Sequence, residues 1–463
     1  MADSNVRCFV DCTETICSGI NTGIQRTVWN IINRHALISK IFDIKVIPVV
    51  SFNGKFYRYF PDRDRKVFVR SLSKLFGTTR DFLDTIFYGK KVNIDALLKI
   101  SISESSRTNA DDGFEAKSTY GPECNNAHLG IIEFCRKILP FFFRCAFYLD
   151  NAFDGFNEAD IDSDDLIFYP DAFWHRCTYL TFTRYDAAKI LLLHDIIPIS
   201  MPQVCDVVYT NLFRRNLAGV LSNVDGIISI SSSELASIKA YFASIGLEPI
   251  PLLDYNYWGA DFIVDQPVPE CVNPDIVKVF SDQQTFLMVG TLEPRKNHAF
   301  VIDAFDQFWC QGGEASLCII GKVSLHCLGL KERIDRHEYW GRRLFCLQDV
   351  NDAELAYSYE NCSGVIFASL AEGFGLPMVE AMWFGRQVLA SDIAVFREIG
   401  GNYPRYFLPD DVHGLVEGLQ ACLENPSDCR QPRQWLTWDE SVQNLFDKVL
   451  HMAAAAKQMK GLA

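Results

Sequence analysis

The sequence lacks the cysteine spacing that marks a zinc site or a disulfide framework. Its 463 residues include 16 cysteines, but no two form a Cys-x-x-Cys pair, and several lie inside apolar runs, as Cys318 does. We therefore expect buried free thiols in a reducing compartment. The sequence also has no Gly-x-Gly-x-x-Gly fingerprint and no Walker pattern, the glycine-rich signatures of two common nucleotide-binding folds.

Positive charge and long apolar runs are also scarce. The formal net charge of -14 argues against a general nucleic-acid binder, which needs a basic patch to displace counterions. The most apolar run, 138–149, contains Arg144 and is too short to span a bilayer. The first residues do not have the charged-then-apolar layout of a signal peptide. We therefore expect a cytoplasmic protein whose membrane contact is at most peripheral, on the inner face of the plasma membrane.

What the sequence has is apolar material for two cores. Hydrophobic residues make up 49% of the 463 residues, which is long for a single core and predicts two large domains. Short apolar strands alternate with helices in both halves, a pattern typical of parallel sheets covered on both faces. The expected strands are 7–11, 45–50, 165–169, 189–193, 226–230, 285–290, 317–321 and 364–368. The expected helices include 24–38, 298–309 and 352–359.

Composition also places the domain limits. A Pro-rich, irregular stretch at 249–275 is expected to be an interdomain linker, which gives an N-terminal domain at 1–262 and a C-terminal domain at 275–433. A last segment, 434–463, follows the second domain. Within the first domain, the polar segment 103–126 is predicted to be a mobile insertion.

Two loops of the second half carry the clearest chemistry. Ligands of doubly wound sheets bind beyond the carboxyl ends of the strands, where loops enter helices. Arg295 and Lys296 stand at such a helix start, where the helix dipole favours anions, so a bound anion would explain them. A solvated basic turn would have the same sequence.

The second of these loops runs from 368 to 381. Gly373 and Gly375 permit close approach of the backbone to a ligand, and the next helix is expected to begin near Pro377. Glu372 then lies in the loop and Glu380 on the helix. The first can accept hydrogen bonds from sugar hydroxyls, and the second from ribose hydroxyls.

Two loops of the first half are less specific. His194 and Asp195 end an apolar strand, a position that favours a catalytic histidine over a purely structural one. Thr22 and Gly23 stand where the first strand's loop enters a helix. A phosphate could approach the backbone amides there, although the pair could also simply start the helix.

Together these residues resemble the donor domain of the family 4 retaining glycosyltransferases, which have the GT-B fold of two Rossmann-like domains facing a central cleft. The resemblance runs through 290–297 and 364–368 to Glu372 and Glu380, which match the family's Glu-x7-Glu signature, and on through 381–385, 396–398 and Gly401. In the first half, 10–11, 22–26, 170–174, 194–195 and 259–262 are similar to a subgroup that builds bacterial surface polysaccharides, many of its members being mannosyltransferases of O-antigen and lipopolysaccharide. Residues 436–441 look like the family's last helix, which packs back on the first domain.

The resemblance implies roles for individual residues. Lys296 matches the cation that holds the donor diphosphate, with Arg295 beside it. Glu372 matches the carboxylate at the donor sugar and Glu380 the one at the ribose. The remaining implied positions are His194 and Asp195 at the reacting centre, Thr22, Gly23, Gly373, Phe374, Gly375 and Leu376 around the donor, and Asp171 and Trp174 at the acceptor. Many members have Gly-Arg where this chain has Gly290-Thr291, so one phosphate-binding cation is missing unless Arg295 replaces it.

The activity implied is transfer of a sugar with retention of configuration. The expected donor is GDP-mannose, bound by the second domain. The expected acceptor is a hydroxyl of a growing, lipid-linked bacterial surface glycan, bound by the first. No cofactor is implied and no metal ion, because no Asp-x-Asp cluster lies near these loops. The alternatives are a UDP-hexose-dependent transferase, a nucleotide-sugar epimerase, and an inactive sugar-binding scaffold of the same fold.

Overall fold

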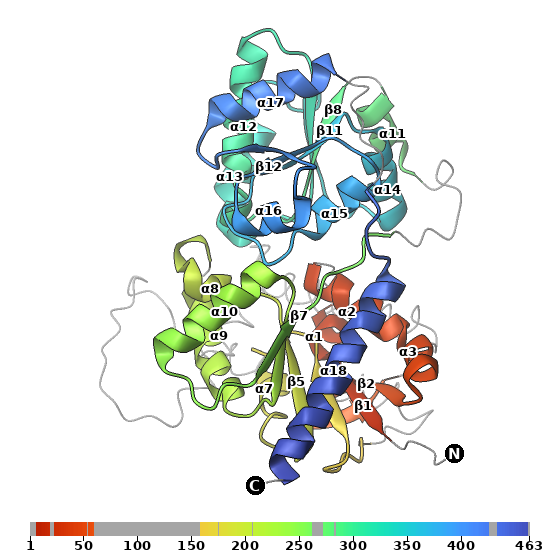
Figure 1. Cartoon of the computed structure of the whole chain (residues 1–463). Helices are drawn as coiled ribbons and strands as arrows, with labels where there is room; N and C mark the ends of the chain where they lie inside the picture. Colours follow the sequence, from red (N-terminus) through yellow and green to blue (C-terminus); the bar gives the residue numbers. More distant parts are fainter. Residues whose placement is uncertain are drawn as a thin grey trace, which may run out of the picture. The chain divides into compact units, whose positions relative to one another are not determined.

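The structure is a computed structural model of the whole chain (Figure 1). The residues that it describes are 6–18, 23–52, 54–59, 158–174, 176–205, 207–261, 272–281, 284–425 and 433–461. Apart from Glu158, they belong to one compact unit within 1–59 and 159–463. The insertion predicted at 103–126 lies outside the described residues.

The first sheet has seven strands in the order β3-β2-β1-β4-β5-β6-β7. All neighbours are parallel except β2 and β3, which form an antiparallel hairpin. The strands are β1 (Arg7–Asp11), β2 (Lys45–Phe52), β3 (Lys55–Arg58), β4 (Leu166–Tyr169), β5 (Ala188–Leu193), β6 (Gly226–Ser229) and β7 (Leu252–Tyr255). The five strands expected in this half are confirmed. The linker prediction was wrong at 252–255, because this half-buried run forms the edge strand β7.

The second sheet has six strands, all parallel, in the order β10-β9-β8-β11-β12-β13. They are β8 (Thr285–Val289), β9 (Ser316–Ile320), β10 (Leu344–Leu347), β11 (Gly364–Phe367), β12 (Val388–Ser391) and β13 (Arg405–Phe407). The two parallel sheets confirm the α/β prediction. In each sheet the strand order reverses once, between β1 and β4 and between β8 and β11. Such switch points are where doubly wound sheets bind ligands.

The helices of the first half are α1 (Thr13–Ser18), α2 (Gly23–Asn33), α3 (His35–Phe42), α7 (Arg176–Tyr179), α8 (Ile197–Ser200), α9 (Val207–Leu221) and α10 (Ser232–Ile245), with a 3-10 turn η2 (Pro202–Val204). The single helix predicted at 24–38 was wrong, because Arg34 separates α2 from α3. Arg34 has a non-helical backbone, with ψ near 8°, and its guanidinium binds Asp439 at 2.6 Å as well as Asn30.

The helices of the second half cover both faces of its sheet, with α12 and α17 on one side and α11 and α14 on the other (Figure 1). They are α11 (Pro274–Ser281), α12 (His298–Cys310), α13 (Leu328–Asp335), α14 (Asp352–Asn361), α15 (Leu376–Trp383), α16 (Ala394–Gly400) and α17 (Val412–Glu424), with 3-10 turns η4 (Pro294–Lys296) and η5 (Leu325–Cys327). The predicted start of α15 near Pro377 is confirmed.

The last helix, α18 (Trp438–Gly461), packs against β5, β6 and β7 of the first sheet. Its Phe446 ring meets Phe168 edge-on, with centroids 5.9 Å apart. Among the described residues, no helix combines the length and apolar character needed to cross a membrane.

The chain passes between the two sheets twice, and the two passages are bonded to each other beside the first sheet. The Ala260 amide donates to the Leu436 carbonyl at 3.0 Å, and the Trp435 indole donates to the Trp258 carbonyl at 2.8 Å. The rings of Trp258 and Trp438 stack with centroids 5.9 Å apart. The outgoing and returning segments therefore form one paired connection.

Candidate functional site

A buried charge cluster lies at the switch point of the second sheet. Glu372, in the loop after β11, accepts hydrogen bonds from Arg295 at 2.7 Å and from the Ser369 hydroxyl at 2.7 Å, and it also pairs with Lys296. Its side chain is only 8% exposed. The two cations stand on η4, one residue before α12, so the loops after β8 and β11 meet at this carboxylate. The structure thus brings together three of the predicted site residues.

The electrostatics keep Glu372 ionised. Burial alone would raise the pKa of its carboxyl group, but Arg295 and Lys296 outweigh burial and hold the pKa at about 2. Burial in turn lowers the pKa of Lys296, although Glu372 counteracts it. Arg295 also binds Glu293 at 2.8 Å. At neutral pH, the cluster is therefore a set of paired ions in which an incoming anion would compete for Lys296.

The glycine loop presses directly on the first half of the chain. A Cβ atom on Gly373 would lie 2.5 Å from the His194 carbonyl oxygen, so no larger residue fits there without movement. The Ser231 hydroxyl donates to the Gly373 carbonyl at 2.7 Å. Gly375 caps α15 with φ +99°, in the left-handed region that favours glycine. Phe374 is buried, and Leu376 begins α15.

His194 is buried, and its Nε2 lies 2.8 Å from the Pro170 carbonyl oxygen. Burial lowers the pKa of the imidazole to about 4, although that carbonyl opposes the change. The ring is therefore neutral at pH 7. Because a carbonyl can only accept, Nε2 carries the hydrogen and Nδ1 carries the lone pair. Asp195 is half-buried; burial raises its pKa, and the charge of Arg295 lowers it.

Glu380 belongs to a second network. It lies on α15 with its side chain 1% exposed, and it accepts hydrogen bonds from Arg26 at 2.5 Å and from the Tyr359 hydroxyl at 2.9 Å. Glu372 and Glu380 therefore have different partners, as expected of carboxylates that serve different parts of one ligand.

The other predicted positions are less decisive. Asp171 is buried, and its carboxylate accepts the backbone N–H groups of Thr15 and Ala172. Trp174 is half-buried among aromatic rings, 5.4 Å from Phe213. Gly23 begins α2 and has open space around its Cα, whereas Thr22 lies outside the described residues. The acceptor roles of Asp171 and Trp174 stay predictions.

Two carboxylates that the sequence did not single out as site residues hold the site together. Glu234, on α10, accepts the Ile196 amide at 2.8 Å and so supports the loop that carries His194. Glu398, on α16 of the second half, accepts the amides of Ser232 and Ser233 at 2.7 Å, at the start of α10. The Ser-x-x-Glu spacing of Ser231 and Glu234 is a capping signature that could have drawn attention to Glu234.

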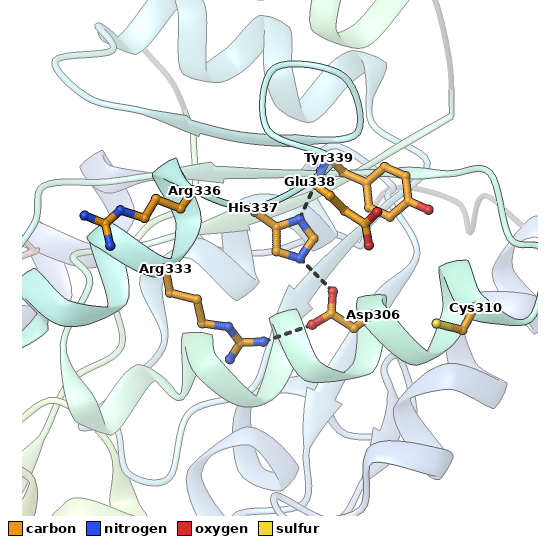
Figure 2. Close-up of a pocket in the computed structure, with 7 residues that line it drawn as sticks. All are labelled: Asp306, Cys310, Arg333, Arg336, His337, Glu338 and Tyr339. Carbon is orange, nitrogen blue, oxygen red and sulfur yellow. Dashed lines mark hydrogen bonds and ion pairs between the residues drawn. The ribbon is translucent and has the colours of Figure 1, made fainter.

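A cavity of about 440 Å³ lies elsewhere, over α12 and α13 (Figure 2). Arg333 and His337 both bind Asp306 there, at 2.9 and 2.8 Å. None of the predicted site residues lines this cavity. Within the described ranges, no cluster of three or more His, Cys, Asp and Glu side chains could hold a metal ion, and metal independence stays a prediction.

A buried acid near the first switch point gives a testable pH dependence. Asp11 is fully buried at the end of β1, and burial, reinforced by Asp171, raises its pKa to about 7. The folded protein therefore keeps a proton between pH ~4 and ~7 that the unfolded chain releases, so the free energy of unfolding falls as pH rises through this window. A rise of about three in pKa corresponds to on the order of 4 kcal/mol.

Asp11→Asn is expected to flatten this dependence, as measured by urea unfolding at pH 5 and pH 8. Asp392→Asn is the control, because Asp392 is exposed and its bond to Arg397 lowers its pKa instead. An Asp11→Asn protein that loses as much stability as the native protein between the two pH values would contradict the assignment.

Comparison with known proteins identifies the class. Residues 273–435 match the family model of Glycosyl transferases group 1. This range contains the whole second sheet and the Glu372 cluster, and this part of the chain belongs to that family. The two parallel sheets have the GT-B fold: TarM of S. aureus, in a complex with fondaparinux, alpha-GlcNAc-glycerol and UDP, superposes with a TM-score of 0.52 at 12% identity, over 97% of this chain and 99% of that one.

Sequence relatives are more specific. Over 333 residues the chain is 32% identical to the serotype-specific mannosyltransferase WbdA of Escherichia coli, covering 67% of this chain and 40% of that protein. Over 152 residues it is 30% identical to the O-antigen chain mannosyltransferase RfbU of Salmonella typhimurium, covering 33% of this chain and 40% of that protein. The alignments thus span less than half the length of either relative.

Proposed function

We propose that the chain is a retaining hexosyltransferase that takes mannose from GDP-mannose. The observation that carries the proposal is the buried cluster of Glu372, Lys296 and Arg295, which lies in the loops at a switch point and whose glycine loop contacts the His194 backbone. The proposal of mannose is supported by the two relatives, both of them named mannosyltransferases.

In this proposal, Lys296 and Arg295 hold the diphosphate and stabilise the charge that builds on it as the sugar leaves. Glu372 accepts hydroxyls of the transferred sugar, and Glu380 accepts those of the ribose. The acceptor hydroxyl attacks on the leaving-group face and gives its proton to a departing phosphate oxygen. Neutral His194 lies beside the reacting centre without adding a charge, and Asp195 sits next to it.

The acceptor in this proposal is a hydroxyl of a growing, lipid-linked bacterial surface glycan. The relative RfbU, an O-antigen chain mannosyltransferase, supports this acceptor class. Contact with the membrane would be peripheral, on the cytoplasmic face.

Incubation with GDP-mannose and with UDP-hexoses tests the reaction. A transferase releases free nucleoside diphosphate when an acceptor is present. An epimerase converts the sugar nucleotide without releasing it, and an inactive scaffold binds without turnover. The absence of release with every donor and acceptor tried would reject the proposal.

Base preference is the second prediction. A buried contact to the base leaves polar groups unpaired with the wrong nucleotide, so discrimination is expected to be pronounced. Calorimetric competition between GDP and UDP measures it. UDP is the alternative because TarM, which shares the fold, was crystallised with it. Tighter binding of UDP than of GDP would reject mannosyl transfer from GDP-mannose and leave glycosyl transfer standing.

Lys296→Ala is expected to weaken nucleoside diphosphate binding tenfold or more. A charge-assisted contact contributes ~1.5–3 kcal/mol. Calorimetry with GDP measures the change, and Lys331→Ala is a matched control because Lys331 pairs on the surface with Asp335. Unchanged GDP affinity in Lys296→Ala would remove the phosphate role from this residue.

A further inference from the structure

The ion pair between Arg26 and Glu380 joins the two halves of the chain at a predicted ligand position. Arg26 lies near the start of α2, in the first half, and Glu380 lies on α15, in the second, 354 residues later. The guanidinium and the carboxylate are 2.5 Å apart, and the two side chains are 19% and 1% exposed. The pair is therefore largely shielded from solvent, where screening is weak.

We propose that Arg26 is a positioning residue for Glu380, which it keeps ionised and oriented to accept the ribose hydroxyls of the donor nucleotide. The inference rests on the proposed function, in which Glu380 binds the ribose. It extends that function by making ribose recognition, which belongs to the second domain, depend on a side chain of the first.

The surroundings of Glu380 show why it needs such a partner. The groups that face it are Arg26 from α2 and Tyr359 and Asp352 from α14. Burial raises the pKa of Glu380 and Asp352 adds to the rise, whereas Arg26 and the Tyr359 hydroxyl lower it. Arg26 is the cation in this set. A buried carboxylate that loses its cation takes up a proton, and a protonated carboxyl offers ribose fewer acceptor lone pairs.

The position of Arg26 on its own helix supports the same conclusion. The first turn of α2 carries no acidic side chain, and the helix dipole disfavours a cation near this end. Nothing on α2 therefore favours an arginine there. The carboxylate that stabilises Arg26 comes from α15, and the pKa of Arg26 is raised because Glu380 outweighs the effect of burial.

Calorimetry with GDP and with 2′,3′-dideoxy-GDP tests the inference. The native protein is expected to bind GDP at least ~10-fold more tightly than the dideoxy analogue, since hydrogen bonds to a charged group contribute ~1.5–3 kcal/mol. Arg26→Met should reduce this ratio to nearly 1, and Arg26→Lys should restore part of it. Arg34→Met is the matched control, because Arg34 follows the same helix but binds Asp439.

A pH series separates this role from a structural one. As pH falls, GDP affinity should drop at a higher pH in Arg26→Met than in the native protein, because Glu380 then protonates more readily. Affinity for the dideoxy analogue should not follow this change. Glu380→Gln should show the same low ratio without the pH dependence, and adding Arg26→Met to it should cause no further loss. If Arg26→Met does not fold, Arg26→Lys and Glu380→Gln carry the same comparison.

An unchanged GDP to dideoxy-GDP ratio in Arg26→Met, or a native protein that binds both equally, would overturn the inference and leave the transferase proposal intact. A native protein that binds neither GDP nor UDP would instead reject the proposed function itself.

Discussion

Replacing Glu372 with glutamine is expected to lower turnover about a hundredfold or more while leaving nucleoside diphosphate affinity unchanged or higher. The carboxylate would orient the transferred sugar, so its loss falls on the chemical step. It also neutralises Arg295 and Lys296, at 2.7 Å from the first. Without it, the two cations have more positive charge to offer a diphosphate.

The same change should destabilise the protein when no nucleotide is bound. Removing one partner of a buried ion pair leaves an uncompensated charge, which costs about 3–5 kcal/mol. Added nucleoside diphosphate should restore part of the lost Tm. Glu293→Gln is the control, because Glu293 also binds Arg295 but is 35% exposed. If Glu372→Gln weakens nucleotide binding as much as it weakens turnover, the carboxylate has a structural role instead.

Gly373→Ala is the second change with a large expected effect. Its Cβ would lie 2.5 Å from the His194 carbonyl oxygen and 2.8 Å from Ile230 Cδ1. A backbone carbonyl cannot turn aside as a flexible side chain does, so the loop must move, at about 1–3 kcal/mol of stability. Moving the loop shifts Glu372, and a displacement of about 1 Å at a reacting centre can reduce turnover about a hundredfold.

Gly329→Ala provides a matched control for this substitution. Gly329 lies in α13 with no atom within 4 Å of the Cβ position, so alanine should be neutral or stabilising by about 0.5–1 kcal/mol. Urea unfolding and turnover measure both variants. Full activity in Gly373→Ala would show that the loop and His194 are not held together in solution.

Strands buried on both faces could be predicted closely from the sequence. β4, β5 and β11 are continuous apolar runs with every residue buried, so their pattern has few alternatives. β7 was missed because it is a half-buried edge strand of four residues next to two prolines. The break between α2 and α3 has no Gly or Pro to mark it, and Arg34 there binds Asp439, 405 residues later.

The site residues could be predicted singly, whereas their partners could not. Glu372 and Lys296 were found because glycines and a strand surround the one and a helix start follows the other. That Glu372 binds both cations, 76 and 77 residues away, depends on the pairing of β8 with β11. That Arg26 meets Glu380 depends on contact between elements of different sheets, which no local pattern encodes.

The paired connection between the sheets restricts how the site can open. A single strand of chain would let one domain twist as well as bend relative to the other. Here Trp258 to Ala260 on the outgoing segment is bonded and stacked to Trp435 to Trp438 on the returning one, which resists torsion and leaves bending as the soft degree of freedom. A bend about one axis would separate Gly373 from His194 and Glu380 from Arg26 in the same stroke, so entry of a sugar nucleotide and exposure of its ribose site would be one mechanical event.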